Sequence, residues 1–344
     1  MEKEQQPRIA LRLQPPPPRR DPWLVQIHGK KEEIQTFFSV SEGRYHVKSI
    51  PEMRGKRICA TYQGWLVLKN LYFLADCILF NPMSLQKFEF PSWENTPYHI
   101  CLLTSPPEQP NCTILLIGSK RIIGKYYTVE GFKVSFTFWH PKNDNWIRKE
   151  INFREKKINA ATCFNGKIYM LDSLHNLLLL ELEPIFGIRD VGVRRLREGA
   201  DKERIGFKST LIESDGELFA VLGLCHPDFD QIFDFEIYRL NLDEKVWEIV
   251  ENTGDRVFFV GFGSCAWCWG SEAGIKGNTI YFTYENDRCL YEFDVEEKSI
   301  TVTLPFPNVK NNWDETAQYS HKGIVFKCYQ IFLSTKIKAG GRVP

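Results

Sequence analysis

The chain has 344 residues, of which 43% are hydrophobic and 25% charged, and its 44 lysines and arginines nearly balance its 43 aspartates and glutamates. These proportions exclude a wholly disordered chain, and a net charge of +1 argues against a dedicated nucleic-acid binder, which needs a basic surface. The longest stretch without a charge, residues 257–271, is too short and too rich in glycine for a transmembrane helix. No apolar segment follows the N-terminal charges, so no secretory signal is expected. The ten scattered cysteines therefore predict reduced thiols in a cytoplasmic or nuclear protein.

Residues 1–21 differ in composition from the rest of the chain. The run Pro15-Pro16-Pro17-Pro18 cannot donate backbone hydrogen bonds and favours an extended polyproline II path. This segment is predicted to be a disordered, mildly basic tail, and a proline-motif ligand for another module is the alternative.

From Asp21 onward, short runs of aromatic and β-branched residues alternate with Gly, Asn, Asp and Pro. This pattern indicates strands separated by turns, and the 14% content of aromatic residues agrees with it. The best helical candidate, Val191 to Arg204, is interpreted as a solvated loop or one short helix.

A turn residue followed by a short apolar strand recurs along the chain. The markers of this repeat are Gly64, Gly118, Gly166, Gly216, Gly277 and Gly323, which follow one another at intervals of 46 to 61 residues. A strand, a tight turn and a second strand come after most of the markers. These copies begin at Ile78, Ser135, Ile237 and Leu290. One such unit is a small antiparallel sheet whose apolar face it cannot bury alone.

Packing such sheets around an axis buries both faces of each sheet, which predicts an all-β fold, a kelch-like β-propeller of six blades. The strands at Trp23 to Ile27 and Ile34 to Val40 are expected to complete the last blade beside the C-terminal strand and so close the ring. The propeller is assigned to residues 22–335, and residues 336–344 are predicted to be a C-terminal tail. A stacked solenoid is the main alternative, and the long uneven intervals suit it less well.

No residue pattern predicts catalysis, a cofactor or a metal. Cys265 and Cys268 form the only C-x-x-C motif and lack a second ligand pair for zinc, so they are interpreted as buried thiols in a strand. The seven histidines, among them His99, His140 and His226, are dispersed. The pairs Glu32-Glu33 and Glu296-Glu297 fall in charged turn segments and are interpreted as solvated.

Tryptophan and arginine offer the only candidates for contacts with a partner. Trp65, Trp146 and Trp247 lie at strand positions and are expected to pack between blades. Four other tryptophans lie in turn-rich sequence. Packing in the core or at the rim is the favoured interpretation for each, and an exposed ring that anchors a partner is the alternative. They are Trp93, Trp267, Trp269 and Trp313. The last candidate is a patch of arginines that could bind an acidic partner: Arg189, Arg194, Arg195 and Arg197. Its positive charge is reduced by the nearby Glu198, Asp201 and Glu203.

Three passages resemble the F-box-associated KIB-type β-propeller family of plants. They are residues 64–68 with 79–82 and 90–91, residues 247–250 with 254–261, and residues 274–282 with 291–295. The resemblance covers about residues 22–326 and implies a propeller that selects a protein target for a cullin-RING ubiquitin ligase. Members of the family usually carry an N-terminal F-box that docks on a Skp-type adaptor. Residues 1–21 are fewer than the roughly 35 that three helices need, so no F-box and no direct adaptor binding are expected.

The function expected from the sequence is therefore non-enzymatic recognition of a protein target whose identity is unknown, with neither nucleic acid nor membrane as a partner. Three alternatives stay open. The chain would compete with full-length F-box relatives, it would be a propeller enzyme with a site in the axial channel, or it would be a truncated gene product with no independent role. Converging carboxylates, histidines or a metal in the channel would favour the enzyme.

Overall fold

The computed structural model describes most of the chain between Pro22 and Leu333. The described residues are 22–28, 33–70, 77–91, 93, 97–123, 129–141, 145–154, 156–194, 196, 206–226, 231–261, 264–284, 289–303 and 330–333. The predicted tails, residues 1–21 and 336–344, lie outside them, as does the last repeat marker, Gly323.

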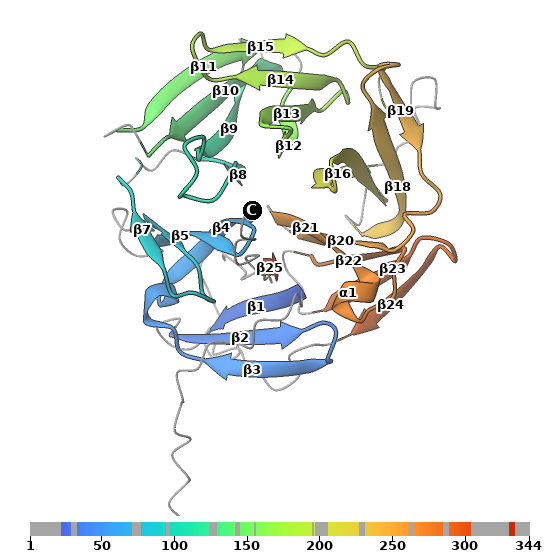
Figure 1. Cartoon of the computed structure of the whole chain (residues 1–344). Coiled ribbons are helices and arrows are strands. Elements are labelled where there is room, and N and C mark those ends of the chain that lie inside the picture. Colours follow the sequence, from blue (N-terminus) through green and yellow to red (C-terminus); the bar gives the residue numbers. More distant parts are fainter. Residues whose placement is uncertain are drawn as a thin grey trace, which may run out of the picture.

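The described strands form six sheets arranged in a ring around one axis (Figure 1), which confirms the predicted six-bladed all-β propeller. Blade 1 combines β25 (Gln330–Leu333) with β1 (Pro22–His28), β2 (Ile34–Ser39) and β3 (Arg44–Lys48). Blade 2 contains β4 (Lys56–Tyr62), β5 (Trp65–Asn70), β6 (Cys77–Phe80) and β7 (Lys87–Glu89), after a short 3-10 helix, η1 (Pro51–Met53). Blade 3 contains β8 (Ile100–Leu103), β9 (Ile114–Ile123), β10 (Val129–Trp139) and β11 (Ile147–Phe153).

The second half of the ring has the same plan until its last blade. Blade 4 contains β12 (Ile158–Phe164), β13 (Lys167–Asp172), β14 (Leu177–Glu181) and β15 (Gly187–Asp190). Blade 5 contains β16 (Gly206–Ser214), β17 (Glu217–Cys225), β18 (Ile232–Asn241) and β19 (Val246–Ile249). Blade 6 has five strands, in the order β21 (Ser264–Trp269), β20 (Arg256–Gly261), β22 (Thr279–Phe282), β23 (Leu290–Asp294) and β24 (Ser299–Thr303).

Gly118 lies inside β9 and Gly277 lies just before β22, whereas other glycine markers of the sequence lie in hairpin turns that join the first two strands of a blade. In three of them both turn residues have positive φ, which is the two-residue type I′ geometry that matches the twist of the flanking strands. These turns are Gln63-Gly64, Asn165-Gly166 and Asp215-Gly216. The repeat is therefore visible in the sequence because this turn needs glycine at a fixed place.

The two ends of the described chain meet in blade 1. Strand β25 pairs antiparallel with β1, in the register Pro22↔Leu333 to Val25↔Gln330. The predicted closure of the ring by N-terminal and C-terminal strands is therefore confirmed, and it removes two open sheet edges.

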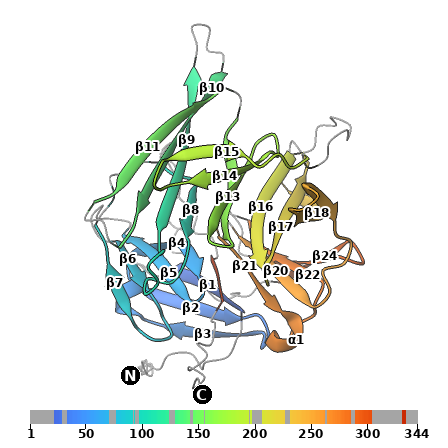
Figure 2. The same ribbon diagram turned by 45° about the horizontal axis from the view of Figure 1, so that its top comes forward.

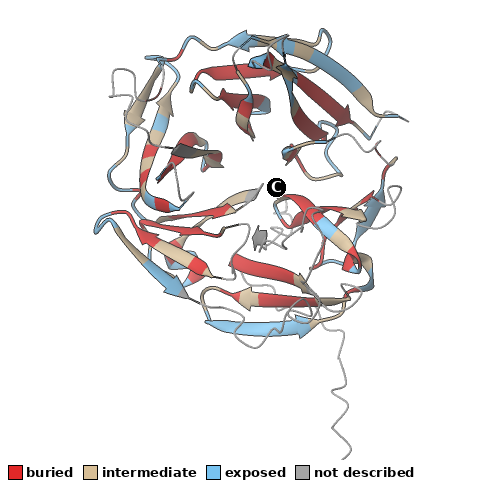
Figure 3. Ribbon diagram, turned by 180° about the vertical axis from the view of Figure 1, so that it is seen from behind, coloured by how far each residue is buried: buried red, intermediate tan, exposed pale blue. Residues whose placement is uncertain are grey.

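The core is divided among the six interfaces between blades. Successive side chains of a strand point to opposite faces of the sheet, so each inner strand contributes to two interfaces. In β9, for example, Ile114 and Leu116 pack against blade 2 while Leu115 and Ile117 pack against blade 4. Figure 3 shows that burial is greatest on the inner and middle strands, whereas outer strands such as β3 and β7 are exposed.

Blade 6 departs from the common plan because β20 is inserted between the innermost strand and the rest of the sheet. Strand β20 pairs in parallel with β22, and β21 pairs antiparallel with β20, so β21 lies closest to the axis (Figure 2). The chain returns from β21 to β22 through α1 (Gly270–Ala273), a single turn of helix that ends at Gly274 with φ 71°.

The segment from Val191 to Arg204, interpreted as a solvated loop or one short helix, contains no helix in the part that the structure describes. Residues 191–194 are irregular, and Val193 and Leu196 are buried in the core between blades 4 and 5. The interpretation as a solvated loop is therefore wrong for these two side chains, which close the interface.

Candidate functional site

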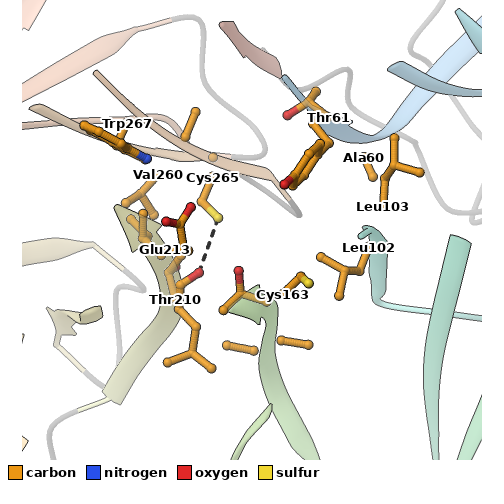
Figure 4. Close-up of a pocket in the computed structure, with 18 of the residues that line it drawn as sticks. Ala60, Thr61, Leu102, Leu103, Cys163, Thr210, Glu213, Val260, Cys265 and Trp267 are labelled. Carbon is orange, nitrogen blue, oxygen red and sulfur yellow. Dashed lines mark hydrogen bonds between the residues drawn. The ribbon is translucent and has the colours of Figure 1, made fainter. Parts of the chain in front are cut away.

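The innermost strands enclose a cavity of about 1810 Å³ along the propeller axis. Its wall is largely apolar and includes Leu102 and Leu103 from β8, Val260 from β20 and Trp267 from β21 (Figure 4). The thiol of Cys265 donates to the carbonyl oxygen of Leu211 at 3.4 Å and fixes β21 beside β16. Strand β21 of blade 6 thus forms one side of the cavity.

The inner strands start at one end of the cavity and finish at the other. At their starting end, Nε2 of His99 lies 2.7 Å from the carbonyl oxygen of Ile158, which joins the beginnings of β8 and β12. Lys157 and Lys208 line the cavity at the same end. We call His99, Lys157 and Lys208 the basic mouth.

The opposite end of the cavity is acidic. Glu213 and Asp215 lie at the end of β16, Glu108 lies in the loop between β8 and β9, and Glu272 lies in α1. We call these four residues the acidic mouth. Three blades contribute to it. The difference in charge between the two ends of the cavity therefore depends on how several blades are arranged in the ring.

Tyr62 and Cys163 face Glu213 across the acidic end of the cavity. Burial raises the pKa of Tyr62, and the nearby Cys163 and Glu213 raise it further. Burial also raises the pKa of the Cys163 thiol, and the negative charge of Glu213 acts in the same direction. Both groups therefore stay protonated at neutral pH and are poor nucleophiles or bases.

A family model for the KIB1-4 beta-propeller matches residues 37–304, which is most of the described propeller. The chain belongs to the KIB1-4 β-propeller family. This result confirms the family resemblance of the three sequence passages.

Relatives of this KIB1-4 propeller include three Arabidopsis thaliana proteins. An F-box/kelch-repeat protein is 21% identical over 80% of this chain and 75% of its own length. Two putative F-box proteins are 26% and 28% identical over 47% and 26% of this chain. The chain spans 42% and 26% of these two relatives, respectively.

Matching solved structures are more distant. A Synechocystis apocarotenoid oxygenase mutant has a TM-score of 0.36 and 11% identity, over 84% of this chain and 78% of its own. A Pyrococcus horikoshii acylaminoacyl peptidase has a TM-score of 0.39 and 11% identity, over 82% of this chain and 46% of its own. At these TM-scores the likeness carries no argument about the KIB1-4 propeller.

The cysteines of the C-x-x-C motif lie in β21, where they line the cavity. The predicted strand position is correct, and both thiols are half-buried: Cys265 packs against the core between blades 5 and 6, and Cys268 packs against the core between blades 6 and 1. Burial raises the pKa of Cys265 to about 12, so its thiol is unreactive at neutral pH. In the described part of the propeller, no three His, Cys, Asp or Glu side chains are grouped as metal ligands would be.

The tryptophans predicted at strand positions do contribute to blade packing. Trp65 is buried between blades 2 and 3, and Trp146 packs against the same core and donates to the carbonyl oxygen of Pro91 at 2.6 Å. Trp247 packs against the core between blades 4 and 5.

The tryptophans from turn-rich sequence have different environments. Trp93 is 2% exposed and stacks on Phe90, so it belongs to the core. Trp267 and Trp269 line the cavity, with their rings in edge contact at 5.3 Å. Trp313 lies outside the described residues.

The other sequence candidates are dispersed over the ring. His140 is half-buried and His226 is exposed. His99 lines the cavity, where enclosure lowers its pKa. Glu296 and Glu297 are exposed, as predicted, in the turn between β23 and β24. Glu33 is half-buried, and Glu32 lies outside the described residues.

The arginine patch is only partly described. Arg189 pairs with Glu181 at 3.3 Å, and the backbone amide of Arg194 donates to Lys245. Arg195, Arg197 and the diluting acids lie outside the described residues. None of the described helices has the length and apolarity that a bilayer span requires.

Sequence reasoning missed the acidic mouth and the residues that face it. No sequence motif indicates the acidic mouth, because its residues are up to about 160 positions apart in the chain. The only local signal is proximity to the repeat markers, since Tyr62 and Asp215 directly adjoin Gln63-Gly64 and Gly216.

Proposed function

We propose that this KIB1-4 propeller recognises a protein target by surface complementarity and catalyses no reaction on it. Family membership carries this proposal, because the Arabidopsis relatives are named F-box proteins. The fold supports it, since short turns anchored by paired strands hold the mouths of the cavity in a fixed geometry.

Tyr62 and Cys163 also support a binding role, whereas His99 and the carboxylates of the acidic mouth are the cavity groups that the enzyme alternative would use. An enzyme needs a nucleophile or base that is deprotonated near neutral pH. Tyr62 and Cys163, whose pKa values respond to the charge of Glu213, both have raised pKa values. Glu213 itself accepts a hydrogen bond from the backbone amide of Gly216 at 3.1 Å, which suits a fixed charge at the rim.

We further propose that the target is selected for, or protected from, ubiquitin ligation. In the first case the propeller is the target-binding part of an F-box protein, and in the second it competes with full-length relatives for the same target. We expect weak or no direct binding to a Skp-type adaptor from residues 1–344 alone.

Proximity labelling in plant tissue, followed by reconstitution with purified protein, tests the proposal. We expect a target that is enriched over an unrelated six-bladed propeller and that binds the purified chain directly. Co-purification with a recombinant Skp-type adaptor separates the two ligase roles. A chain that enriches no protein over the unrelated propeller, or that turns over a substrate, would contradict the proposal.

A further inference from the structure

We infer that the axial cavity receives a basic segment of the partner protein. A lysine or arginine side chain would lie at the acidic mouth, and neighbouring apolar residues would pack against the channel wall. This inference rests on the proposed recognition function and specifies the chemistry of the partner at the same site.

Three of the four carboxylates of the acidic mouth form no ion pair among the described residues. Glu108, Glu213 and Asp215 form no ion pair with any lysine or arginine that the structure places. Some exposed carboxylates elsewhere on the propeller are paired. Glu150, for example, lies 2.6 Å from Lys133 and 2.8 Å from Arg148. Glu108, Glu213 and Asp215 therefore keep their charges available for a cation from outside.

The wall behind these carboxylates suits the rest of a peptide. A cleft lined by charge of one sign and walled by apolar groups focuses the electric field, which strengthens attraction for a cation at its entrance. Tyr62 and Trp267 line the cavity and add aromatic surface that a cation or an apolar side chain can contact. A volume of about 1810 Å³ exceeds that of ordinary small-molecule sites and accommodates several residues of extended chain.

The two ends of the channel also set the direction of entry. Lys157 and Lys208 line the basic mouth, and the carboxylates that line the cavity all lie at the other end. A cationic segment is repelled at the basic mouth and attracted at the acidic mouth. The charge pattern therefore discriminates against acidic segments, which meet like charge at the acidic mouth.

Binding of synthetic peptides to the purified chain tests the inference. The probe is a fluorescein-labelled peptide of about ten residues with lysines among alanine and leucine, beside matched peptides with glutamate or glutamine in place of lysine. We expect the lysine peptide to bind at least about tenfold more tightly than the glutamate peptide in about 50 mM NaCl, with the difference shrinking in about 500 mM NaCl. A benzophenone on the peptide should crosslink to residues of the cavity and not to the outer strands.

The matched variants are Glu213→Gln with Asp215→Asn, and Glu296→Gln with Glu297→Gln. The first pair keeps an acceptor for the Gly216 amide and an asparagine at a position with φ 52°, so the turn is retained. We expect the first pair to weaken binding of the lysine peptide about 3- to 10-fold. The second pair removes the same charge from an exposed turn, and we expect it to change the affinity for this peptide less than about twofold.

Three outcomes would overturn the inference. They are equal binding of the lysine and glutamate peptides, equal loss in both variant pairs, and crosslinks confined to outer strands. The proposed function is judged separately by target capture. A target that binds the wild-type chain and the Glu213→Gln, Asp215→Asn chain equally would leave recognition intact and refute the site.

Discussion

One arginine, Arg256, adds polar contacts to the apolar core between blades 5 and 6, and its removal should destabilise the ring. Arg256 in β20 donates to the hydroxyl oxygen of Ser214 at 3.1 Å and to the carboxylate of Glu217. Its guanidinium also lies 5.3 Å from the centre of the Phe219 ring and 5.0 Å from that of Trp269. The side chain is 18% exposed, so water replaces little of this network.

The cost of the substitution Arg256→Ala can be worked from these contacts. A hydrogen bond to a charged group contributes about 1.5–3 kcal/mol when buried, and a partly desolvated cation–π contact adds about 0.5–1 kcal/mol. Because Glu217 is one-third exposed and also pairs with Arg239, the lower ends of these ranges apply. We therefore expect a loss of about 2–4 kcal/mol in the free energy of unfolding, and about half of that for Arg256→Lys, which cannot reach both partners.

Equilibrium urea unfolding, followed by circular dichroism and tryptophan fluorescence together, measures this loss. The control is Arg148→Ala, which removes an exposed arginine from β11 and should cost less than about 0.5 kcal/mol. If Arg256→Ala costs no more than Arg148→Ala, the network does not hold the two blades together and the reasoning is wrong.

Two further predictions concern backbone packing and buried thiols. A β-carbon at Gly118 would lie 2.2 Å from the carbonyl oxygen of Pro97, so Gly118→Ala should lower the unfolding free energy by about 1–3 kcal/mol. The control is Gly187→Ala, where a β-carbon would meet no atom closer than 4.0 Å. It should lower the unfolding free energy by less than about 1 kcal/mol in the same urea assay. Burial raises the pKa of Cys112 and Cys265 from 9.0 to about 12, so the folded state favours the protonated thiols. Stability is then fully present below about pH 9 and falls as the pH rises toward 12. Urea midpoints measured across this range should fall less steeply in a chain carrying Cys112→Ala and Cys265→Ala, and an unchanged slope would contradict the assignment.

The sequence allowed the number of blades and the closure of the ring to be predicted because those features depend on local chemistry. Turns such as Asn165-Gly166 and Asp215-Gly216 require positive φ at both residues, which leaves a glycine at a regular spacing. Alternating apolar residues beside each turn mark the strands. Strand pairing between neighbours in the chain then fixes most of each sheet.

Blade 6 was harder to predict because its unusual pairing is not local. The parallel contact between β20 and β22 spans α1, and nothing in the residues of either strand specifies a parallel partner. Gly270 could not be explained from the sequence either, because glycine is needed there to let the backbone of a later residue approach closely. A β-carbon there would lie 2.7 Å from the carbonyl oxygen of Ile275. Val193 and Leu196 were assigned to a solvated loop because charged residues surround them in the sequence, but two apolar side chains suffice to close an interface.

A propeller can carry an acidic mouth because the side chains that pack its cores are different from those at the ends of its strands. Alternate side chains of an inner strand enter the two adjoining cores, as those of β9 do on either side of blade 3. Residues at the end of the strand belong to neither core, so Glu213 and Asp215 carry charge without a cost in packing. Substitutions there should change which segment the cavity accepts while the blades stay intact. This separation explains why one ring can present different charges at its two ends, and why the carboxylates of the acidic mouth are the residues on which selection of a partner should depend.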